Sequence, residues 1–168
     1  NFVKKNTMKI FNLIFPLFLI ISCGSPNTDN KSEVNQKSNL SEQIIEEFTL
    51  EAIGNTMQDM KYSLENISVS SGNKVIINLI NKGSDPAMIH NILIINFGSR
   101  KEVAMESVEA GQNLEFIPNN KNVIAASKLA YPGDSVKLEF NAPEPGNYEF
   151  VCTYPGHAEM MRGYFFVN

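Results

Sequence analysis

From Glu47 onward, hydrophobic residues mostly alternate with polar ones, and this two-residue period restricts the fold more than any other feature of the chain. Residues 135–140 and 147–152 follow the alternation strictly, which predicts strands with one hydrophobic face each. The runs at residues 75–80 and 92–95 are rich in β-branched side chains and predict strands that are more fully buried. We therefore expect a chain built mainly from β-strands.

Turn-forming residues separate these runs, and one segment departs from the pattern. Clusters of Gly, Pro, Asn, Asp and Ser occur at residues 71–73, 82–86, 131–134 and 143–146. Residues 101–110, closed by Gly111, instead favour a short helix with a glycine stop. Roughly seven or eight short strands with one helical insertion predict an all-β Greek-key β-sandwich or barrel.

The composition fits one acidic globular domain. The chain has 168 residues, of which 43% are hydrophobic, so it can form one core and is not a disordered chain. Fourteen basic and 18 acidic residues leave a net charge of −4, which argues against nucleic-acid binding. Two cysteines cannot form the dense disulfide framework of a small secreted scaffold.

The first residues have the features of an export signal. Lys9 precedes an apolar run at residues 10–21, which is too short to span a bilayer because a spanning helix needs about 20 residues. We assign residues 1–22 to a signal peptide whose true start is Met8. Cys23 follows in a sequence that resembles a bacterial lipobox, so we expect it to carry a lipid. The alternative is an ordinary signal peptide with an incidental cysteine.

Residues 23–45 are expected to form a flexible tether, because small polar and charged residues dominate there and little can be buried. The folded domain is then residues 46–168. Without the signal peptide, the chain has 18 acidic and 11 basic residues and a net charge of −7. With Cys23 acylated, Cys152 is the remaining free thiol. In an oxidising compartment such a residue is usually buried, paired between molecules or a metal ligand.

A thiol, an imidazole and a thioether lie close together near the C-terminus, at Cys152, His157 and Met161. A Pro-Gly turn at residues 155–156 allows the thiol and the imidazole to face one point. The other histidine of the chain, His90, begins an apolar run. Taken singly, each of these residues is more often part of an ordinary core. Together, two His, one Cys and a distant Met match blue-copper coordination with a weak axial thioether.

These residues resemble those of the cupredoxins, and specifically of the azurins and auracyanins. The resemblance covers residues 48–167 and is strongest at residues 152–161. There, four residues separate Cys from His and three separate His from Met, which is the azurin spacing. Plastocyanins have a shorter loop between Cys and His. Residues 57–62 resemble an early loop beside the metal site of the family, and residues 123–129 resemble a segment that precedes its last strands.

The resemblance implies one type 1 copper ion. The implied ligands are His90, Cys152 and His157 in equatorial positions and Met161 in the axial position. It also implies that Asn91 and Thr153 connect the two ligand loops and hydrogen-bond near the sulfur.

The sequence departs from the azurin pattern at three points. Ile89 stands where azurins have the glycine whose carbonyl approaches the metal, and its branched side chain can alter that approach. The azurin disulfide near the start of the domain has no counterpart. Met160 is a competitor for the axial position, although the loop spacing favours Met161.

The resemblance implies a one-electron carrier that cycles between Cu(II) and Cu(I). The sequence contains no evident catalytic acid–base pair, so we expect electron transfer and not catalysis. The electron would pass through the edge of His157, which would reach the surface within an apolar patch. The predicted members of that patch are Met60, Ala87, Met88, Tyr154, Pro155 and Met160. Glu159, beside His157, is expected to favour docking to a basic partner.

The implied partners are c-type cytochromes, a terminal oxidase or a reductase, and the domain is expected to be monomeric. The implied location is the bacterial envelope, with a lipid anchor and the domain facing the periplasm. A copper-delivery protein without redox traffic is the main alternative. An enzyme with Cys152 as nucleophile and His157 as base leaves His90 and Met161 unused. Zn²⁺ is the alternative metal for the same donors. It prefers four strong ligands, and because a thioether is a weak ligand, the donor set favours copper.

Overall fold

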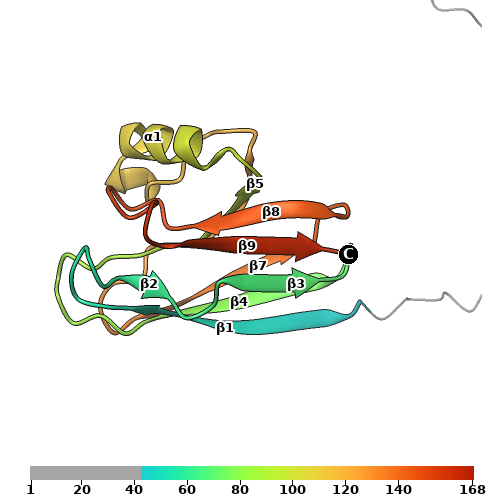
Figure 1. Cartoon of the computed structure of the whole chain (residues 1–168), viewed down its shortest axis with the longest axis horizontal. Helices are drawn as coiled ribbons and strands as arrows, with labels where there is room; N and C mark the ends of the chain where they lie inside the picture. The colour runs from blue at the N-terminus through green and yellow to red at the C-terminus, as the bar shows by residue number, and fades with distance from the viewer. Residues whose placement is uncertain (1–42) are drawn as a thin grey trace, which may run out of the picture. The chain divides into compact units, whose positions relative to one another are not determined.

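The computed structural model describes residues 43–168. The assigned signal peptide, Cys23 and nearly all of the tether lie outside the described residues. Within residues 43–168, two β-sheets pack against each other, and one α-helix and one short 3-10 helix, η1 (Gln112–Leu114), lie outside them (Figure 1). No helix in this part of the chain is long and apolar enough to cross a membrane.

The first sheet has four strands in the order β2-β1-β4-β7. Its strands are β1 (Ile45–Ile53), β2 (Lys61–Tyr62), β4 (Lys74–Asn81) and β7 (Ser135–Asn141). The pair β1 and β4 is parallel, whereas β4 and β7 are antiparallel. Strand β7 lies where the alternation of residues 135–140 predicted a strand.

The second sheet has five strands in the order β3-β9-β8-β5-β6. Its strands are β3 (Asn66–Val69), β5 (Leu93–Asn96), β6 (Val123–Ala126), β8 (Gly146–Val151) and β9 (Arg162–Val167). Strand β8 lies between β5 and β9 and is antiparallel to both. This position matters for the site, because β5 follows His90, β8 leads into Cys152 and β9 follows Met161.

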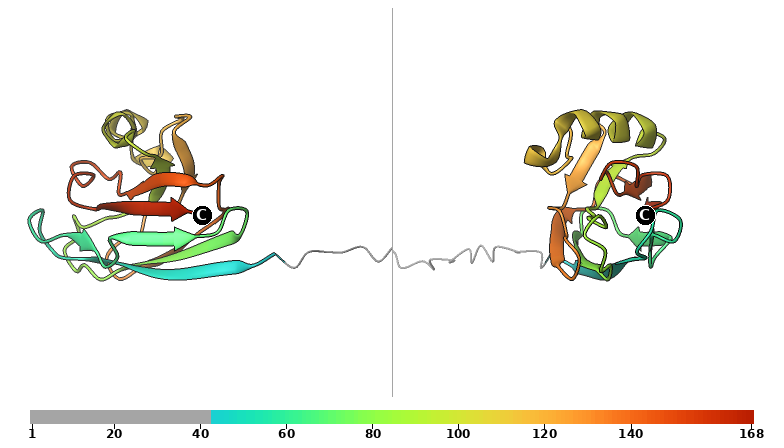
Figure 2. Two further views of the ribbon diagram at one scale, coloured as in Figure 1. Left: turned by 45° about the vertical axis from the view of Figure 1, so that its right-hand side comes forward. Right: turned by 90° about the vertical axis from the view of Figure 1, so that its left-hand side faces the viewer.

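The two apolar runs of the sequence differ in burial. Strand β5 is buried on both faces, as predicted. For β4 the prediction was wrong: Val75, Ile77 and Leu79 are fully buried, but Ile76 and Ile80 on the other face are half-buried. The cause is visible in Figure 2, where the helix covers only the five-stranded sheet.

That helix is α1 (Arg100–Ala110), and it confirms the predicted helical insertion. It ends at Gly111, which has a φ of 71° and therefore a backbone conformation that favours glycine. The buried side of α1 includes Val103. Val103 packs in a second hydrophobic cluster with Leu93, Ile95, Val151 and Ala158. Ala158 belongs to the turn after Cys152, so the helix and this turn share one cluster.

The main core lies between the sheets and reaches the end of the sandwich where β8 stops. Phe150 and Phe165 are its largest fully buried side chains. Cys152 and Met161 belong to the same cluster and are both fully buried. The predicted class, an all-β Greek-key sandwich with one short helix, is thus confirmed, and the end of its core carries two of the sulfur groups singled out in the sequence.

Candidate metal centre

Three of the predicted ligand atoms form a small triangle at this end of the sandwich. The Cys152 sulfur lies 3.9 Å from Nδ1 of His90 and 3.8 Å from Nδ1 of His157, and the two Nδ1 atoms are 3.2 Å apart. All three residues are buried. The sandwich therefore brings together side chains that are 62 and 67 residues apart in the chain.

The size of this triangle fits a first-row transition metal. The point equidistant from the three atoms lies about 2.1 Å from each, given those three separations. Bonds from such metals to nitrogen are about 2.0–2.1 Å and bonds to thiolate sulfur are about 2.3 Å. Two imidazoles and one thiolate in a trigonal set are the donors of a type 1 copper site.

Burial separates the two candidate axial ligands. Met161 is fully buried in the core cluster that contains Cys152, whereas Met160 is 49% exposed. The amides of both methionines donate to the carbonyl of His157, and the Cys152 amide donates to the carbonyl of Met161 at 2.9 Å. These bonds close the turn from Cys152 to Met161 and place the Met161 backbone directly beside Cys152.

Asn91 and Thr153 connect the two ligand loops, as the resemblance implied. The Thr153 amide donates to Oδ1 of Asn91 at 2.8 Å, and Nδ2 of Asn91 donates to Oγ1 of Thr153 at 2.9 Å. Asn91 follows His90 and Thr153 follows Cys152, and both side chains are buried. This reciprocal pair fixes the distance between the two neighbouring ligands.

A third segment, which the sequence did not indicate, completes this network. Nδ2 of Asn91 also donates to the carbonyl of Glu115 at 3.0 Å, and Oγ1 of Thr153 donates to the carbonyl of Phe116 at 2.8 Å. Glu115 and Phe116 have φ values of 54° and 55°, in the left-handed region. Neither is Gly or Asn, the residues that usually mark such a conformation, so the sequence carried no signal for it.

Tyr62 supports the site from the first sheet. Its hydroxyl donates to the backbone carbonyl of Asn91, and its ring packs against Phe150 with centroids 5.6 Å apart. Burial raises the pKa of Tyr62 well above its usual value, with a smaller contribution from Cys152. The sequence placed residues 57–62 beside the site by resemblance, and the structure adds that a buried hydroxyl is what reaches it.

Both histidines are held neutral near physiological pH. Burial lowers the pKa of His90 to about 4, and the charge of His157 contributes in the same direction. Burial lowers the pKa of His157 to about 4 as well. Nε2 of His90 has no hydrogen-bond partner among residues 43–168, so no acceptor there compensates a charge on that ring. Neutral imidazole is the form that binds a metal.

The thiol of Cys152 keeps its proton in the metal-free protein. Burial raises its pKa to about 11, although the amides of Asn91 and Tyr154 and the hydroxyl of Tyr62 act in the opposite direction. The thiolate is the form that binds a metal and the form that acts as a nucleophile. A metal must therefore displace this proton, and the thiol itself is a poor nucleophile.

The predicted apolar patch differs from the surface that the structure presents. Met60 and Met88 are 1% and 4% exposed and belong to the core, so they do not contribute to a surface. His157 is itself only 1% exposed, so its edge does not reach the solvent as predicted. The alternation of hydrophobic and polar residues could not predict this burial, because Met60 and Met88 both lie in loops. Tyr154 and Pro155 are half-buried, and Met160 is exposed.

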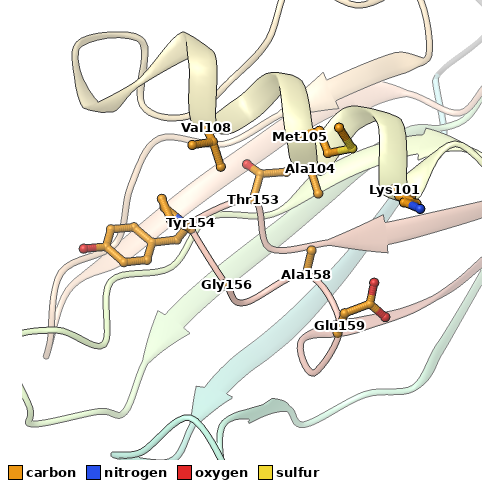
Figure 3. A pocket seen from close by; sticks show the side chains of 10 residues that line it. Lys101, Ala104, Met105, Val108, Thr153, Tyr154, Gly156, Ala158 and Glu159 are labelled. Carbon is orange, nitrogen blue, oxygen red and sulfur yellow. The ribbon is translucent and has the colours of Figure 1, made fainter.

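A surface groove of about 240 Å³ lies between α1 and the ligand turn (Figure 3). Its walls are formed by helix residues on one side and by turn residues on the other. The helix side chains are Lys101, Ala104, Met105 and Val108, and the turn residues include Tyr154, Gly156, Ala158 and Glu159. The insertion therefore lies directly beside the segment that carries the ligands.

The fold and the donor set together define a cupredoxin with a type 1 copper site. A family model described as copper binding proteins, plastocyanin/azurin family, matches residues 50–168. The chain belongs to this family, and copper is accordingly the metal of the site.

Individual relatives agree with this assignment. Auracyanin-A of Chloroflexus aurantiacus is 31% identical over 119 residues, which cover 69% of this chain and 72% of that protein. A solved structure of auracyanin A, a "blue" copper protein, has a TM-score of 0.66, with 28% identity over 74% of this chain and 99% of that one. The solved azurin Az-iso2 from Methylomonas sp. strain J has a TM-score of 0.65, with 31% identity over 73% of this chain and 97% of that one.

One further relative differs in its printed name. Outer membrane protein H.8 of Neisseria meningitidis is 30% identical over 110 residues, which cover 62% of this chain and 60% of that protein.

Proposed function

We propose that this protein is a one-electron carrier of the bacterial envelope, with His90, Cys152 and His157 as equatorial ligands and Met161 as the weak axial ligand. When bound, copper supplies the one-electron couple between Cu(II) and Cu(I). The observation that carries the proposal is the triangle of donor atoms with sides of 3.2, 3.8 and 3.9 Å.

The protein around the donors is arranged so that little moves when the charge of the site changes. His90 and Cys152 are each followed by a residue of the reciprocal Asn91–Thr153 pair. His157 and Met161 are joined by a backbone hydrogen bond of 2.9 Å and lie in a buried turn. A set of ligands held in this way imposes one geometry on both oxidation states, which favours fast electron transfer.

We propose a docking surface that differs in part from the predicted one. Its exposed members are Met57, which is 43% exposed, and Met160, and its half-buried members are Tyr154 and Pro155. The Tyr154 ring lies 4.8 Å from the His157 ring, centroid to centroid. Gly156 also adjoins Met57, since a Cβ there would lie 3.2 Å from the Met57 methyl group. A small apolar surface of this kind suits short-lived encounters.

The proposed partners are c-type cytochromes, a terminal oxidase or a reductase. The net charge of −7 after removal of the signal peptide favours a basic partner. The Glu159 carboxylate is 74% exposed, but its ion pair with Arg100 at 2.6 Å offsets part of the charge that it presents to a partner. The acidic surface as a whole is the better explanation.

The proposed location is the envelope, with residues 1–22 as a signal peptide, Cys23 as a lipid attachment site and a tether that ends at residue 42. Residues 43–45, which the sequence assigned to the tether, belong to the monomeric domain, because Gln43 hydrogen-bonds to Asn141 and Ile45 begins β1. The relative named outer membrane protein H.8 supports an envelope location. Labelling of the full-length protein with a fatty-acid probe in a bacterial host, compared with Cys23→Ser, tests the anchor. Labelling that persists in the variant would refute it.

The absorption spectrum of the Cu(II)-loaded protein tests the copper function. A thiolate bound to Cu(II) gives an intense visible band that bleaches on reduction, and Cys152→Ser should abolish it. A wild-type protein that binds Cu(II) without this band would contradict the proposed site.

The main alternative is a copper-delivery protein, and the structure offers an observation against it. Such a protein must release its metal, whereas the donor atoms here are buried and the histidines are 0% and 1% exposed. Repeated oxidation and reduction in the presence of a copper chelator separates the two functions. A carrier retains its copper through the cycles, and a delivery protein loses it in the Cu(I) form.

A further inference from the structure

Arg100, the first residue of α1, contacts both the ligand turn and the strand that leads into it. Its Nη1 donates to Oε2 of Glu159 at 2.6 Å and to the carbonyl of Ala158 at 3.3 Å. Its Nε lies 3.6 Å from Oε2 of Glu149. The side chain of Arg100 is only 23% exposed, so these contacts are partly shielded from water.

The contact with Glu149 anchors the guanidinium. Glu149 belongs to β8, three residues before Cys152, and its side chain is 11% exposed. One of its oxygens accepts from the Gly98 amide at 3.3 Å, whereas Oε2 has no hydrogen bond within residues 43–168. A buried carboxylate needs a nearby cation, and Arg100 is the cation beside it. The arginine is therefore fixed relative to the strand that leads into Cys152.

The other contacts reach the segment between the last two ligands. Ala158 and Glu159 lie between His157 and Met161, and Ala158 packs under α1 in the second hydrophobic cluster. The Glu159 side chain is 74% exposed, so the pair as such adds little to the stability of the whole protein. Its effect is on position, because one guanidinium holds two points of a short turn.

The place of Arg100 in the helix supports the same conclusion. A positive charge in the first turn of a helix is unfavourable, because the helix dipole is positive at that end. Arg100 also lacks a role as a free surface charge, since both of its acidic partners are within 4 Å. The unfavourable interaction of this positive charge with the helix dipole is offset by the contacts that Arg100 makes outside the helix.

We propose that Arg100 is a positioning residue for the metal site. It holds the turn that carries His157 and Met161 against the end of β8 that carries Cys152, and it acts through Glu159 and the Ala158 carbonyl. The inference rests on the proposed ligand set but concerns the order of the turn, which can be measured without a metal.

The first test is hydrogen exchange in the metal-free protein. The amides of Met160 and Met161 report on the turn, because both donate to the His157 carbonyl. Loss of the charged hydrogen bonds in Arg100→Met should speed the exchange of these two amides about tenfold or more. Lys101→Met is the matched control, because it removes the same charge from the next residue, which has no ion pair within 4 Å in the described part of the chain. Amides of β4 should be unchanged in both variants.

The second test uses the Cu(II)-loaded protein and an excess of a chelator. Loss of a residue that orients metal ligands typically costs about tenfold to a hundredfold in metal retention, so Arg100→Met should lose copper at least about ten times faster. Its visible spectrum should change in band position or intensity, whereas Lys101→Met should match the wild type in both measurements.

A double-mutant cycle shows whether Arg100 acts through Glu159. Glu159→Gln leaves the fold intact because the side chain is largely exposed, and it should produce part of the increase in exchange at Met160 and Met161. In the double variant of Glu159→Gln and Arg100→Met, the increase in exchange should be much smaller than the sum of the increases in the two single variants. Arg100→Lys, which keeps the charge but loses the planar fork, should restore only part of the protection.

The outcomes separate this inference from the proposed function. Unchanged exchange at Met160 and Met161 in Glu159→Gln and Arg100→Met would overturn it, as would equal effects of Arg100→Met and Lys101→Met. If Arg100→Met does not fold, Glu159→Gln and Arg100→Lys decide the matter by the same amides. The strong visible band of the wild-type protein, which decides the copper function, does not depend on any of these results.

Discussion

Asn91 and Thr153 bind each other through two hydrogen bonds although 62 residues separate them in the chain. The bonds join the backbone next to His90 to the backbone next to Cys152. Both side chains are buried, so neither group can exchange its partner for bulk water. The pair therefore fixes the distance between two ligands that flank different strands of the same sheet, with His90 ahead of β5 and Cys152 directly after β8.

Replacing Asn91 with Ala should loosen the site more than the fold. The change leaves the Thr153 amide and the Glu115 carbonyl without their Asn91 partner, and an unsatisfied buried group costs about 1–3 kcal/mol. We expect a loss of that order in the free energy of unfolding, measured with urea on the metal-free protein. We also expect about tenfold to a hundredfold weaker copper binding. Thr153→Ser keeps the hydroxyl and is the control. Copper affinity equal to that of the wild type in Asn91→Ala would contradict the role of the pair.

Replacing Tyr62 with Phe should remove one hydrogen bond and leave the packing in place. The Tyr62 hydroxyl donates to the Asn91 carbonyl, and the ring would still contact Phe150. We expect a loss of about 1 kcal/mol in the free energy of unfolding, from the typical value of such a bond. The visible spectrum of the Cu(II) form should shift, because the hydroxyl acts on the environment of Cys152. A spectrum and a stability identical to those of the wild type would show that the hydroxyl is dispensable.

The stability of the metal-free protein should depend on pH through its histidines. Both native pKa values are about 4, whereas an unfolded histidine titrates near 6.5. Between these values the unfolded chain binds more protons than the native one. Stability is therefore complete above about pH 6.5 and is lost as the pH falls toward 4, by at most about 1.4 kcal/mol per pH unit for each histidine.

Urea unfolding of the metal-free protein at pH 7, 6 and 5 measures this slope. The lowered pKa values of Asp59 and Glu139 affect stability only below the ordinary values of these groups, 3.8 and 4.5, so the window from pH 5 to 7 isolates the histidines. His157→Gln, which is neutral at every pH, should have a smaller slope than the wild type. Equal stability at pH 5 and pH 7 in the wild-type protein would contradict the buried, neutral state of the histidines.

Copper uptake should release a proton from Cys152. The pKa of about 11 means that the thiol is protonated at pH 7, while both histidines are already neutral. Uptake of Cu(II) should therefore release about one proton per metal ion, and the apparent affinity should rise about tenfold per pH unit between pH 7 and 9. Calorimetry in buffers of different ionisation enthalpy measures the proton. Release of two or more protons at pH 7 would show that a histidine is charged in the metal-free protein.

The sequence predicted the strands and the four candidate ligands because these depend on local patterns. Alternation along residues 135–140 requires only that one face be buried, and the spacing from Cys152 to Met161 is contained in a single turn. Burial that depends on another layer was not predictable in this way. The outer face of β4 lacks a helix above it, and the burial of Met60 depends on how distant loops close the end of the sandwich.

The contacts that stabilise the site were the least predictable part. The left-handed turn at Glu115 and Phe116 has no glycine to mark it. The ion pair between Arg100 and Glu159 spans 59 residues, and in the sequence Glu159 read as a free charge beside a ligand. Both features arise because the helical insertion lies against the ligand turn, which is a consequence of the tertiary structure alone.

The exposed methionine beside the site provides the sharpest test of the proposed docking surface. Electron self-exchange requires two copies of the protein to approach each other with their sites close together. Met160 is 49% exposed and lies three residues from His157, so a charge there would face its own copy in the encounter. Like charges brought together in this way oppose association. We therefore expect Met160→Lys to lower the self-exchange rate constant, measured by NMR line broadening, by about tenfold.

Met105→Lys is the matched control, because Met105 is 62% exposed on α1 and is not a member of the proposed docking surface, although it lines the groove beside Tyr154. Both variants change the net charge by one unit, so the general repulsion between two acidic copies falls equally in each. Any difference between them must then come from the position of the charge. Both should keep the wild-type visible band, since neither side chain is a proposed ligand. Equal self-exchange rates in the two variants would place the docking surface elsewhere, because a charge at Met160 would then be no closer to the partner than a charge on the helix.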